Sequence, residues 1–144
     1  MNIQMVQVVL DQYGLREVAG EADNPGIMEM AKECGFTHYK HDEIAWCSLL
    51  MNWAAFKTGY QRSNSLAARS WLGIGEPTET PQMGDIVVFW RISPDGPYGH
   101  VGLYIGTRNG LIYVLAGNQG NEVSIVGFTT EKLLGYRRLS LLAA

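Results

Sequence analysis

The chain has 144 residues, of which 47% are apolar and 17% charged, and its net charge is −3. This length and composition are typical of one globular domain, and we expect a single domain over residues 1–144. The negative charge argues against a nucleic-acid partner, because no basic patch is available to neutralise phosphates. No stretch approaches the ~20 apolar residues that span a bilayer, so we expect no membrane insertion.

Residues 1–80 carry helical signals. Residues 2–13 mix apolar and polar side chains as a short helix does, and Gly14 is placed to end it. Asn24 and Pro25 are typical of an N-cap followed by the first residue of a helix. The second predicted helix therefore begins at this pair and ends at Gly35.

A third helix is predicted from about Glu43 to Lys57, with Asp42 as its N-cap and Gly59 as its end. Its apolar residues recur at spacings of three and four, which predicts one buried face. These residues are Ile44, Trp46, Leu49, Leu50, Trp53 and Phe56. Ser65 is a candidate cap for a last short helix that would end at Gly73.

The second half of the chain carries strand signals. Residues 86–90 form a β-branched and aromatic run, and residues 100–105 form a second run. Asn109-Gly110 is a strong hairpin signal, after which residues 111–115 return as a third strand. Weaker candidates for the fourth and fifth strands are residues 123–126 and 136–139. Helices followed by a strand meander predict an α+β domain with an antiparallel sheet.

Cys47 is the candidate nucleophile. A cysteine attacks as its thiolate, and the partial positive charge at a helix N-terminus favours that anion. The chain has three histidines that could serve as the base, and His100 is the best placed, because it opens a strand between two glycines. A strand is a rigid platform that can pack directly on the cysteine helix.

A third group usually orients the base. If Asn109-Gly110 is the turn of the hairpin, residue 118 falls close to opposite residue 100 or 101. Asn118 could then accept a hydrogen bond from the His100 ring, as in Cys-His-Asn sites. Gln119 is the adjacent reserve candidate.

Four segments together resemble the NlpC-type and CHAP-type cell-wall hydrolases, which are papain-like cysteine peptidases and amidases. They are residues 43–48 (EIAWCS), 84–89 (GDIVVF), 99–102 (GHVG) and 117–120 (GNQG). The resemblance is greatest to a compact bacterial and phage subgroup in which the cysteine follows tryptophan, an Asn-Pro stretch lies upstream and Arg-Ser-Trp links the two halves of the chain. It implies a papain-like fold in which Cys47 is the nucleophile, His100 the base and Asn118 the orienting residue.

The resemblance has one departure, because many NlpC-type enzymes have aspartate where this chain has Trp46. The side-chain donor of the oxyanion hole is therefore open, although the Cys47 backbone N–H can supply one donor. Asp42 and His41 are candidates to line the cleft.

Metal binding is the rival interpretation of the cysteine region. Cys34, His38, His41 and Cys47 are four potential zinc ligands within fourteen positions. Their spacing matches none of the usual zinc patterns, so we expect no metal and no other cofactor. A bridge between the two cysteines is a further alternative, and His38 and His41 are expected on a loop beside the cleft.

Candidate substrate-binding residues are Trp46, Asp42, Arg69, Trp71 and Gln119. Trp71 could form a cleft wall, whereas most tryptophans are core residues. Arg69 could meet a stem-peptide carboxylate, but surface or structural pairing is favoured. Asp42 is more readily explained as a helix-start charge.

The resemblance implies hydrolysis of an amide bond in the peptidoglycan stem peptide, with no metal. Endopeptidase action between D-glutamate and the diamino acid is favoured over N-acetylmuramoyl-L-alanine amidase action.

Residues 1–14 lack the basic n-region of a signal peptide, so we expect synthesis in the cytoplasm and action in the periplasm or wall. Delivery through a membrane lesion would indicate a phage lysin. Delivery by a secretion system would indicate an interbacterial effector with a cognate inhibitor protein. The alternatives are a non-catalytic wall-binding module and a cysteine acyltransferase or peptidase with a non-wall substrate.

Overall fold

The computed structural model describes residues 1–16, 24–36 and 46–142. The elements in chain order are α1 (Ile3–Leu10), α2 (Pro25–Glu33), α3 (Cys47–Thr58), the 3-10 helix η1 (Ala68–Gly73), β1 (Glu76–Thr78), β2 (Ile86–Trp90), β3 (Gly99–Arg108), β4 (Leu111–Gln119), β5 (Glu122–Phe128), the 3-10 helix η2 (Thr130–Lys132) and β6 (Leu133–Arg138). One antiparallel sheet has the strand order β1-β6-β2-β3-β4-β5. The predicted α+β fold is confirmed.

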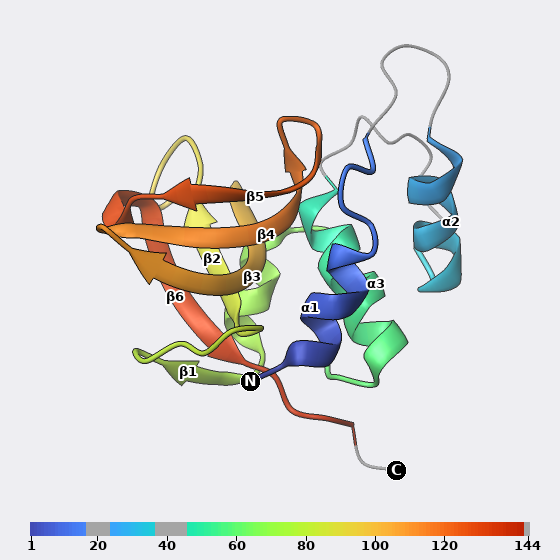
Figure 1. Cartoon of the computed structure of the whole chain (residues 1–144), viewed down its shortest axis with the longest axis horizontal. Helices are drawn as coiled ribbons and strands as arrows, with labels where there is room; N and C mark the ends of the chain where they lie inside the picture. Colours follow the sequence, from blue (N-terminus) through green and yellow to red (C-terminus); the bar gives the residue numbers. More distant parts are fainter. Residues whose placement is uncertain (17–23, 37–45, 143–144) are drawn as a thin grey trace.

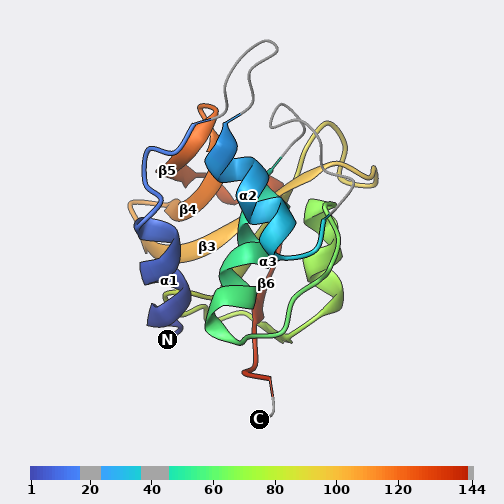
Figure 2. The same ribbon diagram turned by 90° about the vertical axis from the view of Figure 1, so that its right-hand side faces the viewer.

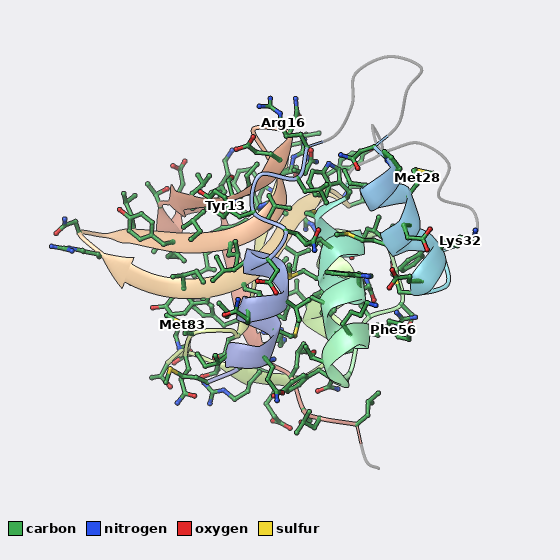
Figure 3. All side chains as sticks on the ribbon, turned by 45° about the vertical axis from the view of Figure 1, so that its right-hand side comes forward. Tyr13, Arg16, Met28, Lys32, Phe56 and Met83 are labelled. Atoms are coloured by element: carbon green, nitrogen blue, oxygen red, sulfur yellow. The ribbon has the colours of Figure 1, made fainter. Side chains whose placement is uncertain are left out.

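Helices α1 and α3 pack against the sheet, and α2 packs against α3. In two perpendicular views α1 lies beside α3, and α2 lies on the outer side of α3 (Figures 1 and 2). Side chains fill the space between these helices and the strands (Figure 3), where Met5, Leu49, Leu50, Leu103 and Leu115 are fully buried. No helix among the described residues is long and apolar enough to cross a membrane.

The first two helices begin as the sequence predicts. The Asn2 side chain accepts from the Met5 backbone N–H at 3.1 Å, and Asn24 accepts from Gly26 at 2.7 Å with Pro25 as the first helical residue. These side chains satisfy N–H groups that have no partner inside a helix.

The third helix differs from the prediction. It begins at Cys47 rather than Glu43, and its N-cap is Trp46, which makes no side-chain capping bond. The predicted capping role of Asp42 is therefore wrong for this helix, and Asp42 itself lies outside the described residues. Phe56, predicted on the buried face, is 50% exposed.

All five predicted strands are present, and most are longer than predicted. The turn at Asn109-Gly110 is confirmed, with φ of 54° and 76° at these two residues, as a type I′ hairpin requires. The short β1 was not predicted. It pairs with β6, and a three-residue segment that includes Pro77 gives little strand signal.

The sheet curls strongly, as one pair of rings shows. Phe89 on β2 and Phe128 on β5 stack with ring centroids 4.8 Å apart, although two strands lie between β2 and β5. In a flat sheet, three strand spacings would separate them by about 14 Å. The concave side therefore encloses a second apolar cluster that includes Tyr104 and Val114. The open end of this curl holds the candidate site.

Candidate active site

Cys47 is the first residue of α3, and its side chain is buried at 3% exposure. The backbone N–H groups of the first helical turn have no acceptor within the helix, so the sulfur lies at the positive end of the helix dipole. The backbone N–H groups of Ser48 and Val101 also help to lower the pKa of the thiol. Both the helix start and the neighbouring strand β3 therefore stabilise a thiolate.

A buried polar network fixes the first turn of α3. The Ser48 hydroxyl donates to the Ser65 carbonyl at 2.6 Å and accepts from the Trp71 indole N–H at 2.9 Å. Asn52, one turn later, donates to Ser65 and accepts from the Asn64 backbone N–H. This network was not predicted, although two polar residues four apart on an otherwise apolar helix face are its signal. It ties the residue after the nucleophile to the segment that precedes η1.

His100 is the second residue of β3 and lies inside the curl, where its ring is 5.6 Å from the ring of Phe128. The flanking glycines serve strand packing. A Cβ on Gly99 would lie 2.7 Å from the Phe89 carbonyl oxygen, and one on Gly102 would lie 2.5 Å from Val114. At Gly99 the start of η1 packs almost as closely, because the same Cβ would lie 3.2 Å from the Arg69 side chain and 3.5 Å from that of Ala68.

Gln119 is the partner of the histidine ring. His100 Nε2 and Gln119 Oε1 are 2.9 Å apart, and both side chains are buried. The Gln119 amide nitrogen donates to the carbonyls of Val114 and Ser124 at 3.2 and 2.8 Å, which turns the amide oxygen toward the ring. Because that oxygen only accepts, Nε2 must carry a proton, and Nδ1 is left to face the thiol. The geometry therefore selects the tautomer in which Nδ1 is the base.

Asn118, predicted for this role, does not make the bond. Along β4, Val114 and Ala116 face the inside of the curl, and strict alternation would place Asn118 there too. The pairing of β4 with β5 shifts between Ala116 and Gln119, and Asn118 adopts a left-handed φ of 61°. This bulge puts the next side chain on the inner face. Asn118 instead lines the adjacent pocket.

The Cys47 and His100 side chains shift each other's protonation. Burial opposes ionisation of Cys47, but the hydrogen bond and positive charge of His100 lower the pKa of the thiol below its ordinary value. Burial also opposes the charged form of His100, yet its bonds to Cys47 and Gln119 raise the pKa of the imidazole. Both shifts favour a thiolate beside an imidazolium.

Cys34 provides an internal comparison. It is buried to the same extent as Cys47, but burial raises the pKa of its thiol. Both cysteines are free thiols. His38 and His41, the other proposed zinc ligands, lie outside the described residues. Within the part of the chain that the structure describes, Cys47 has a histidine beside it that favours the reactive form, and Cys34 has none.

Three predicted substrate-binding side chains have structural partners instead. Trp46 is fully buried, and its ring occupies the space where Gly117 lacks a side chain. Trp71 is also fully buried and is not a cleft wall. Arg69 donates to the carbonyls of Ser93, Pro94 and Tyr98 and so holds the loop between β2 and β3. The substrate-binding expectation is therefore wrong for the two indoles, whereas the structural pairing favoured for Arg69 is confirmed by its bonds to backbone carbonyls.

A pocket of about 540 Å³ opens beside His100. Its walls come from the ends of β2 and β4, from β5 and from η2. The residues that line it are Phe89, Trp90, Arg91, His100, Asn118, Gln119, Gly120, Asn121, Val126, Phe128, Thr129, Glu131 and Lys132. Of these, only His100, Asn118 and Gln119 were singled out from the sequence. Loop and strand-end residues far apart in the chain give no periodic signal that would group them.

A helix-borne thiol, a strand-borne imidazole and an orienting amide, on helices packed against an antiparallel sheet, define a papain-like cysteine hydrolase arrangement. Residues 38–118, more than half of the chain, match the CHAP domain. The chain therefore belongs to the CHAP family, a peptidoglycan hydrolase-type family whose members are generally cysteine peptidases or amidases. The resemblance to CHAP and NlpC domains is confirmed.

Two solved structures have a similar fold. A protein described as similar to lipoprotein of the NLP/P60 family, from Staphylococcus aureus subsp. aureus Mu50, has a TM-score of 0.55 and 21% identity, over 94% of this chain and 40% of that one. NlpC1 from Trichomonas vaginalis has a TM-score of 0.59 and 22% identity, over 94% and 43%. The chain thus spans less than half the length of either protein. A search of curated proteins found no match.

Proposed function

We propose that this protein is a cysteine peptidase or amidase that hydrolyses an amide bond in the stem peptide of peptidoglycan. The observation that carries the proposal is the connected set of Cys47, His100 and Gln119, in which the amide fixes the ring tautomer and the ring activates the thiol. Membership of the CHAP family supports peptidoglycan as the substrate.

In the acylation step, the Cys47 thiolate attacks the amide carbonyl carbon. The carbon–nitrogen bond breaks, and the His100 Nδ1 proton passes to the departing amine. In the second step, Nδ1 accepts a proton from water, the hydroxide attacks the thioester, and the carbon–sulfur bond breaks to restore the thiolate. Gln119 holds Nε2–H throughout. The Cys47 backbone N–H is one candidate oxyanion donor, and Asp42 and His41, the other candidates, lie outside the described residues.

We favour endopeptidase action at the bond between D-glutamate and the diamino acid, with N-acetylmuramoyl-L-alanine amidase action as the second candidate. The proposed site of action is the periplasm or cell wall, reached as a phage lysin or as an interbacterial effector. In the effector setting, the producing cell would need a cognate inhibitor protein. A wall-binding module without catalysis, and an acyltransferase or peptidase with a non-wall substrate, remain the competing functions.

The test is digestion of purified sacculi followed by mass spectrometry of the released fragments. New amino groups on the diamino acid would identify the endopeptidase, whereas free muramyl lactyl groups would identify the amidase. Binding to sacculi without release of fragments would identify the wall-binding module instead. A chelator should leave the rate of fragment release unchanged. Loss of activity in the presence of the chelator would revive the zinc interpretation.

A further inference from the structure

This inference rests on the proposed hydrolase function, which gives the pocket beside His100 a defined position relative to the scissile bond. Its described lining includes the imidazole and the Gln119 amide but not Cys47. In acylation the sulfur holds the acyl half of the substrate, while the imidazole protonates the amine half. The pocket therefore lies on the side of the amine half, which is released first.

The two basic residues of this pocket have no acidic partner among the described residues. Arg91 and Lys132 both line it, and neither makes an ion pair or a side-chain hydrogen bond with any described residue. The Lys132 ammonium lies 5.1 Å from the centroid of the Trp90 ring, which holds it at the pocket wall. Glu131 is the one acidic residue of the described lining, so the positive charges of the pocket outnumber the negative ones.

Arg91 is also close enough to affect the catalytic imidazole. Burial, which is the largest single effect, and the positive charge of Arg91 both oppose the charged form of His100, and the combined effects of Cys47 and Gln119 outweigh them and raise its pKa. An uncompensated cation beside an acid that must be protonated is unfavourable for the reaction. A bound anion next to Arg91 would remove this penalty. The arrangement therefore favours a substrate that brings its own negative charge.

We propose that Arg91 and Lys132 bind a free carboxylate on the amino acid whose amine is released, and so select substrates that are acidic on that side of the bond. Guanidinium is well suited to this role, since its planar donors match a carboxylate. Phe89, Trp90 and Phe128 supply an apolar wall for the aliphatic part of that residue.

The experiment uses two soluble peptides that contain the bond identified in the sacculus digest. They differ only in the amine-side residue, which carries a free carboxylate in one peptide and a carboxamide in the other. Wild type should cleave the carboxylate peptide about 10-fold more efficiently in kcat/KM, as expected for one charge-assisted hydrogen bond. Arg91→Gln should reduce the preference to about 2-fold or less, mainly by slowing the carboxylate peptide.

Arg108→Gln is the matched control, because it removes the same charge from the exposed end of β3, outside the pocket. It should retain the full preference. Lys132→Gln should lower the preference by a smaller factor than Arg91→Gln, because an ammonium offers no bidentate contact.

Equal cleavage of both peptides by wild type would overturn the carboxylate site and leave the hydrolase function intact. An unchanged preference in both the Arg91 and Lys132 variants would also overturn it. If wild type released nothing from sacculi, the proposed function would fail, and this inference with it.

Discussion

Replacing Gln119 by alanine removes the hydrogen bond that His100 Nε2 donates and leaves the ring free to rotate and to change tautomer. The bond is 2.9 Å long and buried, and its acceptor is held by two further bonds to backbone carbonyls. A hydrogen bond to a charged group contributes about 1.5–3 kcal/mol. At 1.4 kcal/mol per factor of ten, kcat/KM should fall by about 10- to 150-fold.

The matched control is Asn118→Gly. Glycine adopts the left-handed φ of 61° at this position without steric cost, so the bulge is kept while the side chain is removed. Because Asn118 makes no hydrogen bond to His100, kcat/KM should fall by much less in this variant than in the Gln119 variant. The assay is fragment release from sacculi at enzyme concentrations normalised by circular dichroism.

A second readout separates orientation from general loss of structure. The Gln119 bond raises the pKa of His100, so its removal should lower the pH at which the imidazolium is lost. The alkaline limb of the rate profile should then move to lower pH in the alanine variant. The reasoning would be refuted if Asn118→Gly lost as much activity as Gln119→Ala, or if the alkaline limb stayed in place.

Three further predictions concern the surroundings of the nucleophile. Ser48→Ala leaves a buried indole N–H without its acceptor and should lower the free energy of unfolding by about 1–3 kcal/mol, measured by urea denaturation; an unchanged midpoint would contradict this. Gly117→Ala places a Cβ 2.6 Å from a buried ring and should lower the free energy of unfolding by about 1–3 kcal/mol. Gly106→Ala is the control, because its Cβ meets nothing within 4 Å, and its free energy of unfolding should stay much closer to that of wild type. The alkylation rate of Cys47 by iodoacetamide should rise with pH through a value below that of an ordinary thiol, because only the thiolate reacts. His100→Ala should move this rise to higher pH, because the hydrogen bond and charge of the imidazole no longer offset burial, and coincident profiles would disprove the coupling.

Local sequence signals predicted most of the elements. The Asn24-Pro25 cap, the Asn109-Gly110 turn and the β-branched run of β2 each depend on a few neighbouring residues, and the structure reproduces them. Hairpin geometry also brought the 118–119 region opposite His100. These features are local or follow from one turn, which is why a single sequence is sufficient to identify them.

The predictions that were wrong concern features that depend on contacts between residues far apart in the chain. Choosing between Asn118 and Gln119 required the bulge in β4, whose shift appears only in the pairing with β5. Trp71 could not be assigned to the core without knowing that Ser48 accepts its N–H. The pocket with Arg91 and Lys132 forms because the sheet curls until β2 approaches β5 and η2. The spacing of residues along the chain does not predict this curl.

The two buried cysteines allow the most direct test of the central claim. Sacculi are incubated with wild type, Cys47→Ala and Cys34→Ala, and soluble stem-peptide fragments are quantified by mass spectrometry. Both thiols are buried and free, but only Cys47 lies beside His100. We expect fragments from wild type and Cys34→Ala and none from Cys47→Ala. Undiminished release by a folded Cys47→Ala protein would contradict the assignment of Cys47 as the nucleophile.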